Sequence, residues 1–305
     1  MSQILTVFGA TGNQGGSVIK SILADPVLSK QWKIRGVTRD TTKPAAQALA
    51  AKGVELVSAD MSSTESALAA VTGADTVFLV TNFWESMSRE IEVAQGKAVT
   101  DACKIANVKH LIFSSLLDVT KISNGRLPNL SHFDSKAEIE QYIRDSGVPA
   151  TFVLAGLYTT NFFEMLNKQG DVYTLAWPVD MDKAQVPLFD PAEDTGKFVK
   201  AAIKHFPATA GQRILAAEEY YSPRQIVEEF QEVTGYKAQT AQVPADVFKS
   251  FLPENIAQEI LENILLLEIP GYYAGESLAP SRKLLDEDDK PTTWKEFVAR
   301  NKGKF

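Results

Sequence analysis

The segment GATGNQGG at residues 9–16 constrains this chain more than any other. It follows the apolar, β-prone run Ile4–Phe8 and leads into Gly16–Leu23, where apolar residues recur at helical spacing. In such a strand–turn–helix unit, glycines permit a tight turn, a close approach of the backbone to a pyrophosphate, and close packing of helix on strand. Free N–H groups and the positive end of the helix dipole then face the phosphates. The predicted phosphate-binding turn comprises Gly9, Ala10, Thr11, Gly12, Asn13, Gln14 and Gly15, and the alternative is a turn without a ligand.

Strand-like and helix-like segments alternate through residues 1–160. The further predicted strands are Trp32–Thr38, Val54–Ser58, Thr76–Val80, His110–Phe113 and Thr151–Leu154. The helical stretches between them include Ala45–Lys52, Thr64–Val71 and Ile91–Ala106. Because the strands are continuously apolar, both faces of the sheet should be covered. The pattern predicts an α/β fold, a Rossmann-like doubly wound parallel sheet.

The alternation weakens after about residue 160. Short strands are expected at Val172–Leu175 and Val186–Phe189, and a helix should begin near Ser222 and stop at Gly235. Further helices are expected over Ile256–Leu267 and from Thr293 onward. We therefore predict a dinucleotide-binding domain over residues 1–160 and a smaller α+β C-terminal domain over 161–305. A later strand and helix near 190–217 should return to the first domain.

Composition excludes several classes of protein. The net charge of −7 gives no electrostatic footprint for direct binding to nucleic acid. No apolar run approaches the roughly 18 residues that a membrane helix needs, and the first twelve residues show no signal-peptide pattern. The single cysteine, Cys103, excludes an intrachain disulfide and favours a reducing compartment. Three scattered histidines beside one cysteine lack the spacing of a zinc site, so no metal is expected.

The end of the second strand indicates which dinucleotide binds. Arg39 stands where a nicotinamide adenine dinucleotide site usually has an acidic residue, and Lys43 follows four residues later. A guanidinium can pair bidentately with a 2′-phosphate, so these residues predict NADP(H) as the cofactor. In the alternative reading, Asp40 makes the contact and Arg39 is a surface charge.

Polar residues also follow other strands at the edge where an open α/β sheet binds ligands. Asp60, Thr81 and Ser114 lie at or just past predicted strand ends. For Thr81 and the adjacent Asn82, ordinary turn chemistry is the alternative.

Four segments together resemble the NmrA-like proteins, which are atypical short-chain dehydrogenase/reductases. They are GATGNQGG, Val37-Thr-Arg39, Val80-Thr-Asn82-Phe-Trp84-Glu85 and His132-Phe-Asp-Ser-Lys136. The resemblance covers essentially the whole chain and is best in the first 165 residues. It implies an NADP-binding Rossmann domain with a smaller C-terminal domain. It also implies a redox-sensing regulator of transcription or signalling that acts through protein partners, with little or no dehydrogenase activity.

The resemblance further assigns roles at matching positions. Residues 9–14 would wrap the pyrophosphate, Arg39 to Lys43 would hold the 2′-phosphate, and Asp60 with Met61 would reach the adenine. Thr81, Asn82 and Phe83 would line the middle of the cofactor, and Lys97 and Lys136 would meet its ribose or nicotinamide end. The residues closing that end would be Leu157, Tyr158, Thr159 and Thr160, where the match is looser.

The proton donor of a classical short-chain dehydrogenase is missing. Such an enzyme places a tyrosine four residues before a lysine, and here His132 stands four residues before Lys136. His132 could donate a proton if the helix begins at Ser131, but a capping box at Ser135-x-x-Glu138 would leave it in a loop. Lys136 could also act alone, as isoflavone-reductase-like relatives suggest, or serve only as a ligand of the cofactor ribose.

These readings leave two main hypotheses. The first is an NADP(H)-binding regulator whose partner is a transcription factor or signalling protein. The alternative is an NADPH-dependent reductase of a hydrophobic carbonyl or phenolic substrate that uses Lys136 or His132. The segment 117–130 is expected to be a long loop above the nicotinamide end. We expect no membrane association and a cytoplasmic location, with the nucleus as a further compartment; the oligomeric state is left open.

Overall fold

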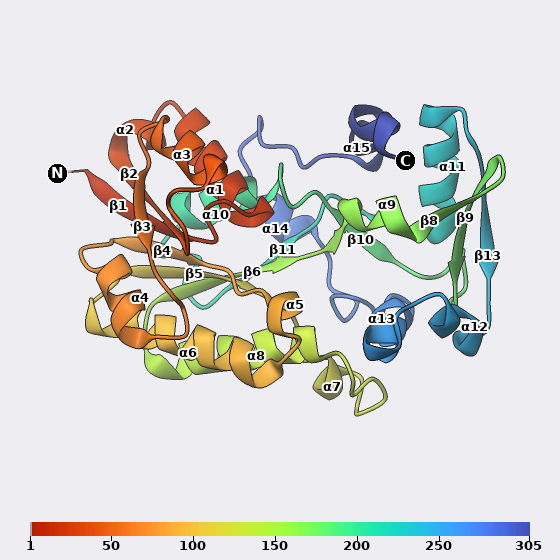
Figure 1. The fold of residues 1–305 in the computed structure, drawn as a ribbon, viewed down its shortest axis with the longest axis horizontal. Coiled ribbons are helices and arrows are strands. Elements are labelled where there is room, and N and C mark those ends of the chain that lie inside the picture. Colours follow the sequence, from red (N-terminus) through yellow and green to blue (C-terminus); the bar gives the residue numbers. More distant parts are fainter. Residues whose placement is uncertain (1) are drawn as a thin grey trace.

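The computed structural model describes residues 2–305, and its largest layer is a seven-stranded parallel sheet (Figure 1). The strand order is β3-β2-β1-β4-β5-β6-β11. These strands are β1 (Gln3–Phe8), β2 (Trp32–Thr38), β3 (Glu55–Ser58), β4 (Thr76–Leu79), β5 (His110–Ser115), β6 (Ala150–Ala155) and β11 (Arg213–Ala216). The order reverses between β1 and β4, and such a reversal leaves a crevice at the carboxyl edge of a sheet. The predicted Rossmann-like parallel sheet is confirmed.

Helices cover both faces of this sheet (Figure 1). The helices on one face are α1 (Asn13–Ala24) and α10 (Thr195–Lys204), and those on the other are α4 (Thr64–Val71), α6 (Arg89–Ile105) and α8 (Ser131–Ser146). Two glycines allow the helices of each face to approach closely. A Cβ at Gly196 would collide with the Ser17 carbonyl, and one at Gly96 would collide with Ile139.

A second lobe holds two three-stranded sheets, ordered β12-β10-β7 and β13-β9-β8. Their strands are β7 (Leu157–Tyr158), β8 (Leu166–Gln169), β9 (Val172–Trp177), β10 (Val186–Phe189), β12 (Tyr220–Tyr221) and β13 (Lys237–Gln242). The helices around them are α9 (Phe162–Met165), α11 (Pro223–Thr234), α12 (Ala245–Ser250), α13 (Glu254–Leu266), α14 (Ala279–Arg282) and α15 (Trp294–Asn301). The remaining short helices are α2 (Leu28–Gln31), α3 (Pro44–Ala50), α5 (Phe83–Ser86), α7 (Val119–Ile122) and two 3₁₀ turns, Thr159–Asn161 and Lys302–Lys304.

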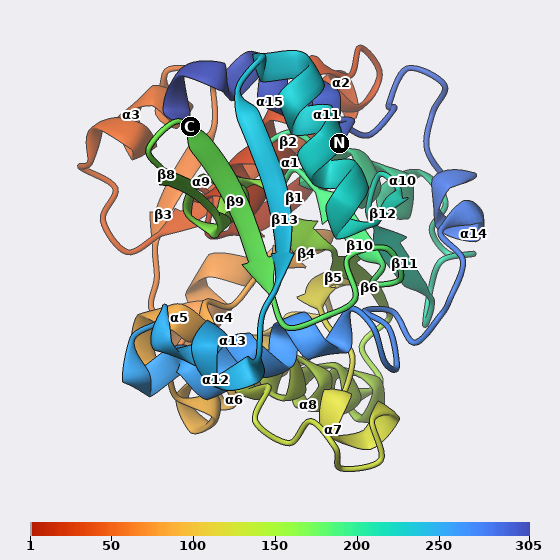
Figure 2. The same ribbon diagram turned by 90° about the vertical axis from the view of Figure 1, so that its right-hand side faces the viewer.

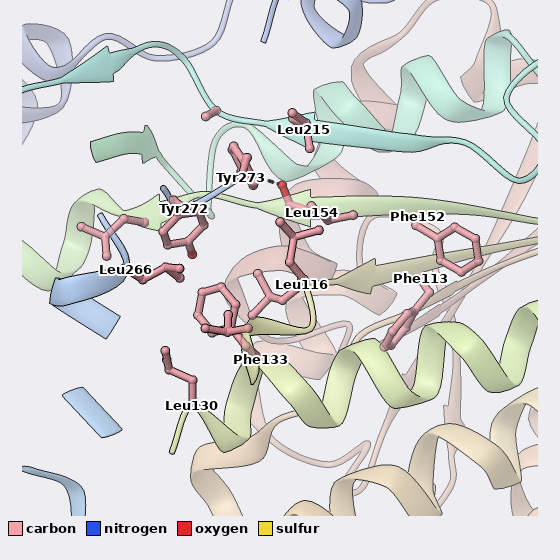
Figure 3. Packing of buried hydrophobic residues seen from close by; sticks show 14 of the residues in the cluster. Phe113, Leu116, Leu130, Phe133, Phe152, Leu154, Leu215, Leu266, Tyr272 and Tyr273 are labelled. Atoms are coloured by element: carbon pink, nitrogen blue, oxygen red, sulfur yellow. Dashed lines mark hydrogen bonds between the residues drawn. The ribbon is translucent and has the colours of Figure 1, made fainter. Parts of the chain in front are cut away.

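The buried apolar residues form two clusters, and the larger of them spans both lobes. The turn after α13 inserts two tyrosines beside the large sheet (Figure 3). Tyr273 donates its hydroxyl hydrogen to the Leu154 carbonyl of β6 at 2.8 Å, and the Tyr272 ring lies edge-on to Phe133 of α8 with centroids 5.3 Å apart. Both tyrosines are at least 95% buried. Aromatic side chains buried to this degree each contribute about 2–3 kcal/mol, so the second lobe is anchored on the sheet rather than loosely tethered.

Several local predictions are confirmed and two are corrected. Helix α11 begins with the predicted capping box at Ser222 and ends at Gly235, and α15 begins with the one at Thr293. The capping box predicted at Ser135 is wrong, because α8 begins at Ser131 and carries His132 in its first turn. The segment 117–130 is not a plain loop, since it contains α7. Every helix in residues 2–305 is too short or too polar to cross a lipid bilayer.

Candidate functional site

The glycine turn after β1 forms an open cradle at the carboxyl edge. Gly9 has a φ of +65°, which favours glycine, and the N–H of Gly12 donates to its carbonyl at 2.9 Å. A Cβ at Gly15 would collide with the same carbonyl, so helix and turn are in direct contact there. Among the described residues, no side chain caps α1 and no acidic residue lies in its first turn. The N–H groups of its first turn, Asn13 to Gly15, are therefore free to bind an anion such as a diphosphate.

The predicted turn residues divide by exposure. Gly9, Thr11, Gly12 and Asn13 are exposed, whereas Ala10, Gln14 and Gly15 are buried. The exposed members present backbone to solvent at the carboxyl end of β1, which is where a ligand would lie.

Two basic residues stand beside β2, on the side of the turn toward β3. Arg39 and Lys43 are both exposed, and the Arg39 guanidinium is paired with the Glu85 carboxylate of α5. Asp40 is engaged in its own turn, because its carboxylate accepts hydrogen bonds from the N–H and the hydroxyl of Thr42. These Thr42 hydrogen bonds lower the pKa of Asp40. Asp60 is exposed past β3, and its carboxylate accepts from the N–H of Ser62, with Met61 half-buried beside it.

A buried polar network lies at the end of β4. The ammonium of Lys136 donates to the Thr81 carbonyl at 3.0 Å, to the Thr81 hydroxyl at 2.8 Å and to the Glu92 carboxylate at 2.5 Å. Ser135 also donates to Glu92, which is 1% exposed. Because an ammonium has three N–H donors, this network uses all the donors of Lys136. The adjoining Asn82 is exposed, and Phe83 is buried.

In the described chain, Lys97 and Ser114 form no hydrogen bond with that network. The Lys97 ammonium lies 3.1 Å from the Glu138 carboxylate and 5.4 Å from the centroid of the Tyr142 ring. Within residues 2–305, Lys97 therefore forms no hydrogen bond with Thr81 or Glu92, the partners of Lys136. Ser114 is 2% exposed near the end of β5. The Tyr142 hydroxyl, the nearest tyrosine after Lys136 in sequence, donates to Asp101 at 2.8 Å.

His132 is held by the second lobe. Its backbone N–H donates to the Glu259 carboxylate of α13 at 2.8 Å, and its ring Nδ1 lies 2.6 Å from the same oxygen. Because a carboxylate only accepts, this contact places a ring proton on Nδ1. The ring also lies 4.9 Å from the exposed Trp84 ring, centroid to centroid. The Nδ1 proton of His132 is thus hydrogen-bonded to Glu259 of α13.

Residues 157–160 lie beside the glycine turn. The Gln14 amide donates to the Tyr158 hydroxyl at 2.5 Å, which joins α1 to β7. Burial raises the pKa of Tyr158 to about 12, although the Gln14 hydrogen bond opposes this, so the phenol stays protonated at neutral pH. Leu157 and Thr159 are buried, and Thr160 is half-buried. The Thr159 hydroxyl oxygen is buried without a hydrogen-bond partner in the described chain.

The arrangement can bind an extended, doubly anionic ligand more readily than it can transfer protons. The exposed turn, Arg39 and Lys43 line one edge, whereas Lys136 and His132 have their donors occupied. No cluster of side chains in residues 2–305 could hold a metal ion. A cavity of about 380 Å³, lined by residues such as Trp32 and Phe206, lies at the opposite, amino-terminal edge of the sheet.

The sequence does not predict the carboxylates that pair with Lys136, His132 and Arg39 at this edge of the sheet. Glu92 and Glu259 lie on helices with ordinary amphipathic spacing, and their partners are 44 and 127 residues away. Glu85 lies in the segment Val80–Glu85, which resembles the NmrA-like proteins, but no local signal predicts its pairing with Arg39, which stands 46 residues earlier. Glu92 lies on the apolar, buried face of α6, and a charged residue in such a position indicates that it has a partner of opposite charge.

Comparison with known proteins gives consistent results. The model of the NmrA-like family matches residues 1–298. The oxidoreductase malD of Malbranchea aurantiaca, which contains an NmrA-like domain, is 34% identical over 252 residues, covering 77% of this chain and 74% of malD. The solved structure of NmrA, a negative transcriptional regulator, in complex with NADP superposes with a TM-score of 0.81 at 23% identity, covering 98% and 94% of the two chains. That of Citrobacter sp. triphenylmethane reductase with NADP(H) gives 0.76 at 22% identity, covering 97% and 99%.

Proposed function

We propose, for a chain that belongs to the NmrA-like family, that it binds NADP(H) at the carboxyl edge of its large sheet and acts as a redox-sensing regulator. The exposed glycine turn would hold the pyrophosphate, and Arg39 with Lys43 would hold the 2′-phosphate. Asp60 and Met61 would lie at the adenine, and Thr81 to Phe83 at the middle. The NADP complexes of NmrA and of the Citrobacter reductase, which share this fold, support the choice of cofactor.

One observation supports regulation over dehydrogenation. Lys136 donates all its N–H bonds to Thr81 and Glu92, and the position four residues earlier is His132, whose Nδ1 faces Glu259. A classical dehydrogenase needs a hydroxyl whose pKa such a lysine lowers. Here the lysine charge is balanced by a buried carboxylate, and Tyr158 has a raised pKa. The bound nicotinamide would supply a hydride acceptor or donor, whereas in residues 2–305 the N–H donors of Lys136 and His132 are already hydrogen-bonded and are not free to move the accompanying proton.

A protein partner is part of this proposal. The corner between α5 and α6 exposes Trp84, Met87 and Ile91, each by 41% or more, next to Glu85. Apolar side chains gathered beside a ligand edge favour contact with another protein. Because Glu85 is paired with Arg39, a cofactor that binds Arg39 would directly alter the contacts of the corner between α5 and α6. Transcription factors or signalling proteins in the cytoplasm or nucleus are the proposed partners.

A reductase is the second candidate. It is favoured by the oxidoreductase name of malD and by the fold shared with the Citrobacter reductase. Such an enzyme would reduce a hydrophobic carbonyl or phenolic substrate, with Lys136 or His132 as the proton source.

Cofactor titration combined with a turnover screen tests the proposal. Trp84 is 41% exposed, while Trp32, Trp177 and Trp294 are at most 8% exposed, so acrylamide quenching of tryptophan fluorescence reports mainly on α5. We expect NADP⁺ to change this quenching and NADPH not to be consumed with carbonyl or phenolic substrates. Steady turnover that is lost in Lys136→Met, without any change in quenching, would instead establish the reductase.

A further inference from the structure

An ion pair crosses the carboxyl edge of the large sheet above the glycine turn. Arg39 follows β2, Glu85 lies on α5 after β4, and β1 runs between these two strands. Both side chains are exposed, by 74% and 50% respectively. Within residues 2–305, neither of them forms another ion pair. The pair thus joins two segments 46 residues apart across the strand that leads into Gly9.

The same guanidinium is the group that a 2′-phosphate would need. A planar guanidinium binds a carboxylate and a phosphate with the same pair of N–H donors, so the two anions compete. Lys43, four residues on, is exposed and has no ion-pair partner in the described chain, so it is available to the phosphate at once. Arg39 is available only when Glu85 leaves it.

We propose that Glu85 is a specificity-determining residue that narrows the preference for NADP(H) over NAD(H) by holding Arg39 in the unliganded protein. This inference rests on the proposed NADP(H) site. A 2′-phosphate gains the Arg39 contact only by displacing a carboxylate, whereas NAD(H), which has no such phosphate, does not need Arg39. An exposed pair is weak enough to be displaced, so Glu85 lowers the selectivity without abolishing it.

When a 2′-phosphate displaces Glu85 from Arg39, it also removes a contact that holds α5 in place. Glu85 and Trp84 are neighbours on α5, and the Trp84 ring lies 4.9 Å from His132, which is bonded to α13. Loss of the Arg39 contact would release the only ion pair that ties the described part of α5 to β2. Binding of a 2′-phosphate would thereby change the contacts between α5, His132 and α13 of the second lobe.

Calorimetric titration of the full chain with NADP⁺ and NAD⁺ tests this role. We expect Glu85→Gln to strengthen NADP⁺ binding about threefold to fivefold and to leave NAD⁺ binding within about twofold. Arg39→Gln should weaken NADP⁺ binding and abolish the benefit of Glu85→Gln in the double variant, because Glu85 acts through Arg39.

The matched control is Glu90→Gln. Glu90 is an exposed carboxylate near α5 whose partner is the Ser88 hydroxyl, so its loss changes the net charge equally and leaves Arg39 bound. An equal gain in Glu90→Gln, no gain in Glu85→Gln, or a gain that persists without Arg39 would each overturn the assignment. Wild-type protein that binds neither dinucleotide would overturn the proposed function itself, and this inference with it.

Discussion

The Lys136 ammonium and the Glu92 carboxylate form an ion pair that solvent scarcely reaches, with side chains 11% and 0% exposed. Removing both charges from water is costly, and their attraction offsets that cost only when the remaining donors and acceptors are satisfied. Here Thr81 and Ser135 satisfy them. The pair therefore fixes where α6 and α8 meet the end of β4, whatever further role the lysine has.

Breaking this pair from one side should be more damaging than removing it whole. Lys136→Met leaves the Glu92 carboxylate buried without a countercharge, and we expect a loss of about 3 kcal/mol in the free energy of unfolding. The double variant Lys136→Met with Glu92→Gln should recover much of that loss. Urea denaturation of the single and double variants measures the coupling. Purely additive losses would show that the two charges do not stabilise one another.

Two glycines in the same turn should respond differently to enlargement. Gly12 has a φ of −87°, and a Cβ there would lie 3.3 Å from the Gly9 carbonyl, so Gly12→Val should cost about 1 kcal/mol or less. It should nonetheless abolish dinucleotide binding, because the side chain would occupy the space of the pyrophosphate. A Cβ at Gly15 collides with backbone, so Gly15→Val should cost about 3 kcal/mol or more. Thermal unfolding and NADP⁺ titration together separate these outcomes. Full binding by Gly12→Val would place the phosphates elsewhere.

Residue-level prediction from the sequence succeeds where the signal is local. The glycine spacing placed the turn, because conformational freedom at Gly9 and close packing at Gly15 are needed within one short segment. The partners of Lys136 and His132 could not be predicted in this way. Each is a carboxylate on a different helix, and only the tertiary fold brings them together.

The first turn of α8 is capped from another part of the chain. Two carboxylates of α13 accept backbone hydrogens in this turn or just before it: Glu259 from His132 at 2.8 Å and Glu262 from Asn129, which precedes the helix, at 2.7 Å. Figure 2 shows α13 running alongside the layer that contains α8. Negative charge at a helix start is favourable, so the Glu259 contact both satisfies a first-turn N–H that has no intrahelical partner and joins the two lobes.

Removing these carboxylates should loosen α8 at its start. We expect Glu259→Ala and Glu262→Ala each to lower the free energy of unfolding by about 1–2 kcal/mol. Hydrogen exchange should rise in residues 129–134 before it rises elsewhere in α8. Glu254→Ala, which removes an exposed carboxylate from the same helix, is the control. Unchanged exchange at residues 129–134 in both variants would show that α13 does not cap α8.

Element prediction failed where capping or pairing is supplied at a distance. The capping box expected at Ser135 is a valid local signal, but α8 begins four residues earlier, at Ser131, where Glu259 of α13 accepts the N–H of His132. Strand β13 has the sequence KAQTAQ, which lacks apolar alternation, and it forms because β9 lies alongside it. By contrast, β2 and α4 form over the predicted residues, because apolar periodicity and flanking turns agree there.

Ion pairs fasten the late part of the chain across the first lobe. Lys204 of α10 lies 2.7 Å from both Asp25 and Asp286, and Lys200 lies 2.5 Å from Asp289. Burial raises the pKa of Asp25, but Lys204 and the N–H groups of Leu28 and Val27 outweigh it and hold that pKa well below its ordinary value. The Lys204 hydrogen bond likewise lowers the pKa of Asp286. The ion pairs of Lys200 and Lys204 with Asp289 and Asp286 thus form a clasp that joins the run Leu285–Asp289 to α10.

Acid should lower the free energy of unfolding by protonating the aspartates that pair with Lys204. Because the folded-state pKa values of Asp25 and Asp286 lie below the unfolded value of about 3.9, their stabilisation is complete above that pH. It is lost as the pH falls through the folded-state values. Asp25→Asn should cost about 2 kcal/mol at pH 7 and less at pH 3, measured by urea denaturation at both. The exposed Asp171→Asn should cost little at either pH. An equal cost of Asp25→Asn at the two pH values would contradict the linkage.

The position of β11 has a consequence for how the protein is made. This strand completes the large sheet beside β6, yet it is synthesised only after the chain has passed through β7 to β10 of the second lobe. While a ribosome releases the chain from its amino terminus, β6 therefore waits as an open edge until residue 216 emerges, and the clasp at Asp286 comes later still. An open strand edge invites pairing with other chains. Nascent copies spaced closely on one messenger are thus most vulnerable to association during the interval between residues 155 and 216.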